Sequence, residues 1–160
     1  MLPLNLFLYF SDSKNIKIQK MASEAKHPAG LKIMFFTEMW ERFGFYLLLG
    51  ILQLYLTDAE NGGMAMERKS AADIYGTFIA LVYLTPFLGG LIADRKWGYS
   101  KSITIGGILM GLGYLGLAIG TLPTFYASLR LIIIGNGFFK PNISTLVGNL
   151  YNNDKYRANK

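Results

Sequence analysis

The stretch IMFFTEMWERFGFYLLLGILQLYL, residues 33–56, sets three charges, Glu38, Glu41 and Arg42, in an apolar run long enough to cross a bilayer. Each charge at mid-membrane costs roughly 2.5–3.5 kcal/mol on insertion scales. Residues three and four apart are neighbours on a helix, so these charges share one face with Phe45. We expect that face to avoid lipid. Such a cluster is typical of a proton or substrate site.

The composition indicates a membrane protein with several spans. The chain has 160 residues, is 52% hydrophobic and has a mean hydropathy of +0.30. It has no Cys, and its single His, His27, lies outside the apolar runs. Disulfides and thiolate nucleophiles are thereby excluded, and a zinc or histidine-based site has almost no ligands to draw on. We therefore predict neither an enzyme nor a metal or organic cofactor.

The net charge of +6 follows from where the basic residues fall. Most lie in one set of alternate segments, and Arg68 and Lys69 lie in the other. The larger set is Lys14, Lys17, Lys20, Lys26, Lys32, Arg95, Lys96, Lys101, Lys155, Arg157 and Lys160. Basic residues favour cytoplasmic segments, so the N-terminus, the loop at Arg95 and the tail are predicted to be cytoplasmic. This placement favours the cell (plasma) inner membrane and makes nucleic acid an unnecessary partner.

We predict an all-α protein with four transmembrane helices, at residues 33–56, 74–93, 103–122 and 125–147. Short links make successive helices antiparallel. Residues 57–73 are expected as an outer loop and residues 94–101 as a short basic link that turns at Gly98. Two pairs of glycines in the third helix have the small-xxx-small spacing that permits close helix packing. They are Gly107 with Gly111 and Gly116 with Gly120.

The two ends differ from the middle. Residues 1–26 are expected to be a cytoplasmic extension, with Met21 as the true initiator. Residues 27–151, which hold the four predicted helices, are expected to form one partial domain, identified below by its resemblance as the N-terminal domain of a transporter. Residues 152–160 are expected to be a truncated cytoplasmic tail.

Lys140 is a cation deep in the fourth apolar run, followed by Pro141, which frees a backbone carbonyl. One interpretation is a lysine that snorkels to the interface. Its distance from the helix end, roughly 10 Å at 1.5 Å per residue, favours burial. Glu38 or Glu41 can neutralise Arg42 in a purely structural pair. A pair between the other Glu and Lys140 would bind a proton when a helix movement separates it.

Three motifs together resemble the proton-dependent oligopeptide transporter family of the major facilitator superfamily. Residues 38–46, EMWERFGFY, are similar to its first-helix signature E-x-x-E-R-F-x-Y-Y. Residues 135–142, GNGFFKPN, are similar to the fourth-helix signature G-x-G-x-x-K-P-N. Residues 89–98, GGLIADRKWG, look like the superfamily loop between helices two and three.

The resemblance implies proton-coupled symport of di- and tripeptides by alternating access. It implies proton coupling by Glu38, Glu41, Arg42 and Lys140. It implies peptide binding by Tyr46, Tyr83 and Lys140, and a cytoplasmic gating loop containing Gly90, Asp94, Arg95 and Gly98. The four helices would begin the six-helix N-terminal bundle, and the C-terminal half of the transporter would be missing.

Two positions depart from the family pattern. Phe45 replaces the first Tyr of the Y-Y pair, and Leu49 stands where many members carry a pocket Arg. These departures leave open a same-family transporter of another substrate. A four-span membrane protein that does not transport is a further alternative, although it leaves the charge cluster unexplained.

Overall fold

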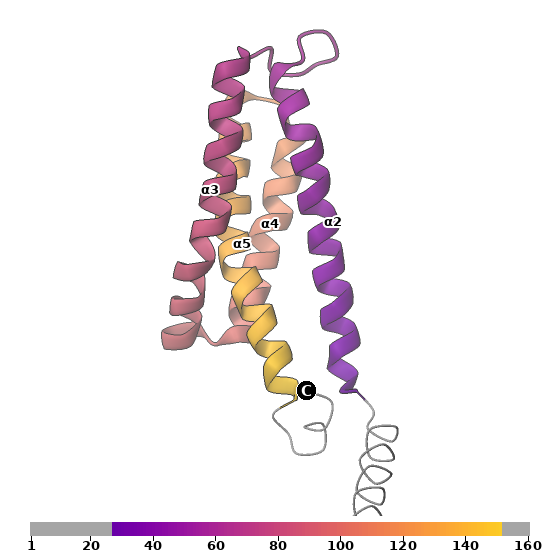
Figure 1. The fold of residues 1–160 in the computed structure, drawn as a ribbon, viewed down its shortest axis with the longest axis vertical. Coiled ribbons are helices and arrows are strands. Elements are labelled where there is room, and N and C mark those ends of the chain that lie inside the picture. The colour runs from indigo at the N-terminus through magenta and orange to yellow at the C-terminus, as the bar shows by residue number, and fades with distance from the viewer. Residues whose placement is uncertain (1–26, 152–160) are drawn as a thin grey trace, which may run out of the picture. The chain divides into compact units, whose positions relative to one another are not determined.

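The computed structural model describes residues 27–151, which are almost entirely helical (Figure 1). The helices are α2 (Ala29–Thr57), α3 (Arg68–Ile92), the π-helical segment η1 (Ala93–Trp97), α4 (Tyr99–Leu117) and α5 (Leu122–Leu150). The all-α prediction is confirmed for this part of the chain. The predicted extension at 1–26 and tail at 152–160 lie outside the described residues.

Two of the helices are long and apolar enough to cross a membrane. They are α3 continued by η1, over Arg68–Trp97, and α5. The charges of Glu38, Glu41 and Arg42 lower the mean hydropathy of α2, and the polar first turn of α4, which contains Lys101, lowers that of α4. Membrane spans at α2 and α4 therefore stay predictions.

The links between helices differ from those that the sequence indicated: the first two are shorter, and the third is longer. The predicted short link at residues 94–101 is reduced to a turn at Gly98: the turn is confirmed, and the link on either side of it is wrong because those residues are helical. η1 carries the helix on through Trp97, and the chain leaves helical geometry at Gly98, with φ of 75°. α4 ends at Leu117 rather than at residue 122, before Gly120, whose φ is 74°. Pro123 lies at the start of α5, where a missing N–H costs nothing.

The described residues fall into two compact units, and residues 35–146 make up the larger part. Its core is built where α2, α3 and α5 meet. The Phe45 and Phe78 rings lie 6.3 Å apart between centroids, and the Tyr55 and Phe125 rings lie 6.0 Å apart. Leu52, like the three Phe, is almost fully buried. This packing fixes the face of α2 that carries the charges.

The smaller unit takes in the start of α2 and the end of α5. The His27 Nδ1 atom lies 2.8 Å from the Tyr151 hydroxyl, and the two rings meet edge to face. Gly30 lies against the Leu150 side chain.

Helices α4 and α5 approach closely through glycine. A Cβ atom at Gly106 would lie 2.7 Å from the Gly135 carbonyl oxygen and 2.8 Å from the Phe139 nitrogen. The predicted pair Gly107 and Gly111 is wrong as the contact: Gly107 meets only the Phe139 ring at 4.0 Å, and Gly111 faces open space. Adjacent residues on a helix point about 100° apart, so Gly106 faces the backbone of α5 and its neighbour Gly107 does not.

We expect Gly106→Ala to destabilise the folded protein by about 1–3 kcal/mol, because the added methyl meets the backbone of α5. Gly111→Ala is the matched control, and it is expected to be neutral or stabilising by up to about 1 kcal/mol through helix propensity alone. Thermal unfolding in detergent measures both. Equal effects of the two substitutions would contradict the packing assigned to Gly106.

Helices α3 and α5 cross at a second glycine contact. A Cβ atom at Gly89 would collide with the Gly137 carbonyl oxygen. That carbonyl has no helical donor four residues on, because Pro141 lacks an N–H. One turn away, the Thr85 hydroxyl donates to the Ile133 carbonyl at 3.1 Å. The crossing thus seats the carbonyl freed by Pro141 against a residue without a side chain.

Asp58 organises the loop between α2 and α3. Its carboxylate accepts backbone N–H bonds from Glu60 (3.3 Å), Asn61 (2.9 Å) and Gly63 (3.3 Å), and a side-chain bond from Asn61 (3.1 Å). Partial desolvation acts to raise the pKa of Asp58, but these hydrogen bonds outweigh it and hold the pKa below its ordinary value of 3.8.

The lowered pKa of Asp58 predicts an acid-labile loop. A carboxyl group with a depressed folded pKa stabilises the fold above its unfolded pKa, and the contribution is lost as the pH falls through the folded value. We therefore expect the amides of Asn61 and Gly63 to lose protection only below about pH 3.8. Hydrogen exchange, corrected for intrinsic rates, measures this. Asp58→Asn should remove the pH dependence, and protection that is already lost above pH 3.8 would contradict the lowered pKa of Asp58.

Candidate functional site

The charged face of α2 lies toward the other helices. The Glu41 side chain is 5% exposed and that of Arg42 is 24% exposed. Glu38, one turn earlier, is half-buried, and Phe45, one turn later, is 3% exposed. The spacing of three and four residues thus brings all four onto a face covered by protein.

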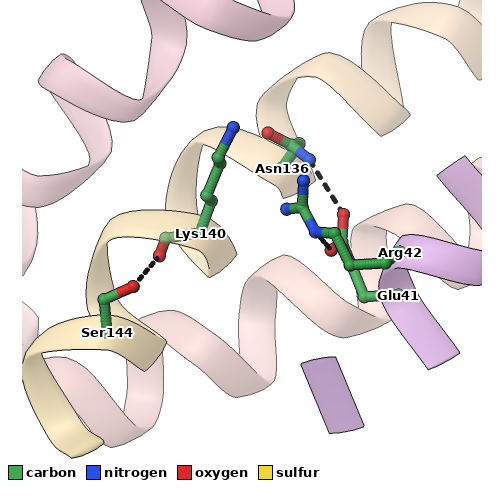
Figure 2. A network of polar contacts seen from close by, with 5 residues as sticks. All are labelled: Glu41, Arg42, Asn136, Lys140 and Ser144. Atoms are coloured by element: carbon green, nitrogen blue, oxygen red, sulfur yellow. Dashed lines mark hydrogen bonds and ion pairs between the residues drawn. The ribbon is translucent and has the colours of Figure 1, made fainter. Parts of the chain in front are cut away.

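Glu41 is held by two partners. Its Oε2 atom forms an ion pair with Arg42 Nε at 2.6 Å, and its Oε1 atom accepts a hydrogen bond from Asn136 Nδ2 at 3.1 Å (Figure 2). The Arg42 guanidinium also lies over the Phe45 ring, 5.9 Å from the centroid. This cation–π contact needs only the aromatic ring, so the hydroxyl of a tyrosine is not required for it. A charged pair on α2 is therefore tied across the bundle to α5.

Lys140 lies one turn after Asn136 on α5 and is half-buried (Figure 2). Its Nζ atom lies 4.9 Å from the centroid of the Tyr83 ring on α3. Within residues 27–151 no carboxylate approaches Lys140 to ion-pair distance, although its charge acts on Glu41 from farther away. The structure therefore puts this cation against an aromatic ring, with the Glu41 carboxylate within electrostatic reach, rather than in the direct pair that the sequence indicated.

The two tyrosines named from the sequence are open to the outside of the helical unit. Tyr46 is 61% exposed and Tyr83 is 65% exposed. Tyr83 meets Lys140, and Tyr46 packs against the Phe45 ring at 5.9 Å between centroids. The structure thus brings Tyr83 and Lys140 together, whereas the contact described for Tyr46 is with Phe45.

Sequence reasoning missed Asn136 and Tyr114. Asn136 is completely buried, and its Oδ1 atom has no hydrogen-bond partner among the described residues. The Tyr114 hydroxyl on α4 is likewise buried without a described partner, near Gly44 and within the electrostatic reach of Glu41. One indication of Asn136 was present in the sequence: it is a polar amide in an apolar helix, one turn before Lys140.

The gating-loop residues fall on η1 and its flanks. Gly90 lies against the Pro141 ring, Asp94 and Arg95 are exposed, and Gly98 makes the turn. The Tyr99 hydroxyl donates to the Asp94 carboxylate, and this bond together with the carboxylate charge raises the pKa of Tyr99. Asp94 thereby ties the end of α3 to the start of α4.

Arg130 lies away from this cluster. It lines a groove of about 380 Å³ between α3 and α5, together with Asp73 and Tyr126. None of the candidate site residues lines this groove. Arg130, which lies nearer the start of α5 than Asn136 and Lys140 do, is therefore separate from the Glu41 cluster.

Comparison with known proteins gives consistent matches. Residues 100–160 match the family described as the POT family. The chain is 45% identical over 134 residues to the di-/tripeptide transporter of Lactococcus lactis subsp. lactis (strain IL1403), covering 81% of this chain and 27% of that protein. It is 39% identical over 129 residues to the peptide transporter YePEPT of Yersinia enterocolitica subsp. palearctica serotype O:3 (strain YE-P4), covering 78% and 25%.

Solved structures agree with the sequence matches. The crystal structure of a Glu-to-Gln mutant of the peptide transporter POT in complex with alafosfalin superposes with a TM-score of 0.78 at 36% identity. The match covers 88% of this chain and 31% of that one. The sulfate complex of the same mutant gives 0.78 at 35% identity. The chain thus spans about a quarter of the length of the curated relatives it matches, and these relatives are transporters rather than enzymes.

Proposed function

We propose that this chain, which belongs to the POT family of peptide transporters, supplies the first helices of a carrier that moves di- and tripeptides into the cell together with protons. The proposal covers a whole transporter of the length of its relatives, with this chain as its N-terminal part. It places the protein in the cell (plasma) inner membrane as a multi-pass protein with a cytoplasmic N-terminus.

The observation that carries the proposal is the buried Glu41, shared between Arg42 on its own helix and Asn136 on α5. A buried carboxylate near the bilayer centre is costly and marks a proton or ion pathway by default. Proton uptake by Glu41 would weaken its pair with Arg42 and loosen the link between α2 and α5. Glu38 and Lys140 act on the same carboxylate through their charges.

Lys140 and Tyr83 are proposed to receive the peptide. The lysine cation stands over the exposed Tyr83 ring, where a peptide carboxylate can reach it. Tyr46, also exposed, would line the same pocket once the rest of the transporter encloses it. Substrate binding between the two halves of a transporter is typical of such inverted-repeat folds.

The gating loop is proposed to brace the cytoplasmic side during alternating access. Its turn at Gly98, the Asp94–Tyr99 bond and the contact of Gly90 with Pro141 join α3, α4 and α5. Arg95 is exposed on this segment and available to a partner from the remainder of the transporter.

The test is uptake by the whole transporter in proteoliposomes with an acidic exterior. A labelled dipeptide should accumulate above its external concentration, and a protonophore should abolish the accumulation. Accumulation that is insensitive to the protonophore would contradict proton coupling.

A second candidate is a transporter of the same family with a different anionic or peptide-like substrate. Phe45 is buried without a hydroxyl, and the half-buried Leu49 offers no cation on the same face. Competition of labelled dipeptide uptake by a panel of peptides and small anionic compounds separates the two candidates. Stronger competition by a non-peptide than by any di- or tripeptide would favour the second.

A further inference from the structure

We propose that Asn136 is a positioning residue that hydrogen-bonds the Glu41 carboxyl group in both its ionised and its protonated form. This inference rests on the proposed role of Glu41 as the proton-binding group. It adds a residue on α5 that carries no charge and takes up no proton.

The geometry singles out this amide. Asn136 is fully buried, and its Nδ2 atom donates to Glu41 Oε1 at 3.1 Å. The two residues lie on different helices and are 95 positions apart in sequence. The Asn136 Oδ1 atom is buried and has no hydrogen-bond partner among the described residues. A buried acceptor without a hydrogen bond costs free energy of folding. The position of Oδ1 beside a carboxyl group that can be protonated therefore indicates a functional reason for keeping it.

The chemistry of the amide supplies that use. An ionised carboxylate only accepts hydrogen bonds, whereas a protonated one also donates through its O–H. An asparagine amide offers two donor hydrogens on one side and an acceptor oxygen on the other. Rotation of the Asn136 amide by 180° would present Oδ1 to a protonated Glu41. One side chain thereby serves both states without a change of helix position.

The other groups around Glu41 act differently. Arg42 and Glu38 on α2, Lys140 on α5 and Tyr114 on α4 all interact with its charge. Arg42 binds Oε2, which leaves Oε1 to Asn136. Arg42 and Lys140 favour only the ionised form. Among these groups Asn136 is the uncharged one that contacts the carboxyl group by a hydrogen bond.

A second buried asparagine on α5 provides the contrast. Asn142 is 1% exposed, and its Nδ2 atom donates to the Phe138 carbonyl at 2.6 Å within its own helix. It stabilises α5 locally and has no described bond to Glu41. Asn142→Leu and Asn136→Leu thus make the same chemical change on one helix, and only the second removes a partner of the carboxyl group.

The test measures the carboxyl group itself in the whole transporter. Infrared difference spectra, with the Glu41 band assigned by its loss in Glu41→Gln, give the pH midpoint of protonation. In Asn136→Leu both forms of Glu41 lose a hydrogen bond, but the bond to the ionised carboxylate is charge-assisted and therefore the stronger of the two. We expect the midpoint to rise by about 1 pH unit, which corresponds to this difference in bond strength. Proton-driven uptake should shift with it along the pH axis. Asn142→Leu should leave the midpoint in place.

Each outcome decides the inference. An unchanged midpoint in Asn136→Leu overturns it. If that variant does not fold, Asn136→Ser is measured instead, because serine keeps a smaller donor and acceptor. Its midpoint should lie above the wild-type value by less than about 1 pH unit, and a wild-type midpoint overturns the inference again. A shifted midpoint together with normal uphill uptake in Glu41→Gln would keep the positioning role and defeat the proposed proton role. Lost uptake in Glu41→Gln together with an unchanged midpoint in Asn136→Leu would support the proton role of Glu41 and defeat the positioning role of Asn136.

Discussion

Glu41→Gln in the whole transporter is expected to abolish uphill peptide uptake. The substitution keeps the shape and one acceptor for Asn136, but it removes the group that binds a proton and the ion pair with Arg42. A positioned acid–base group contributes about 10²–10⁴-fold to a proton-linked step, so we expect a loss of at least about 100-fold. Proteoliposomes with an imposed proton gradient measure the rate of accumulation.

Two comparisons make the Glu41 result specific. Glu60→Gln changes an exposed carboxyl in the loop between α2 and α3 and should leave accumulation unchanged. Exchange of labelled for unlabelled peptide, with no proton gradient, should survive in Glu41→Gln if substrate binding is intact. Uphill accumulation retained in Glu41→Gln would defeat the assigned proton role.

Lys140→Ala is expected to reduce uphill uptake to background and to weaken peptide binding by on the order of ten-fold or more. The change removes a cation that contacts the Tyr83 ring at 4.9 Å and acts on Glu41. A hydrogen bond between charged groups, here Lys140 and the peptide carboxylate, is worth about 1.5–3 kcal/mol, and each 1.4 kcal/mol is a factor of ten. Competition binding and gradient-driven uptake measure the two effects separately.

Tyr83→Phe is the control for Lys140, since it keeps the aromatic ring and removes only the hydroxyl. We expect it to retain the cation–π contact and most of the uptake. If Tyr83→Phe is as damaging as Lys140→Ala, the hydroxyl acts on the peptide directly and the role given to the ring is wrong.

Much of the helical layout could be predicted from residue patterns. The apolar runs located all four helices, and the spacing of Glu38, Glu41 and Arg42 identified the face of α2 that the bundle covers. Charges in oily segments are informative because an unpartnered one is so costly. Residues 94–97 were misjudged, since a basic composition suggested a loop although nothing before Gly98 breaks a helix.

The remaining features depend on how helices meet. Gly106 and Gly107 are equivalent in sequence, and only the position of α5 decides which one becomes the contact. Asn136 could not be singled out from the sequence, because it carries no charge and its importance arises from a carboxylate on another helix. The partner of Lys140 could not be deduced either, because both an acidic side chain and an aromatic ring satisfy a cation, and the choice is made by α3.

The Glu41–Asn136 bond has a consequence for biogenesis. The two residues are 95 positions apart, and synthesis runs at about 5–20 residues per second. For roughly 5–20 s after α2 is made, therefore, Glu41 and Arg42 lack the hydrogen bond that the Asn136 amide will donate to Glu41. During that interval α2 should stay next to the insertion machinery rather than diffuse into lipid, and its final placement should await the emergence of α5.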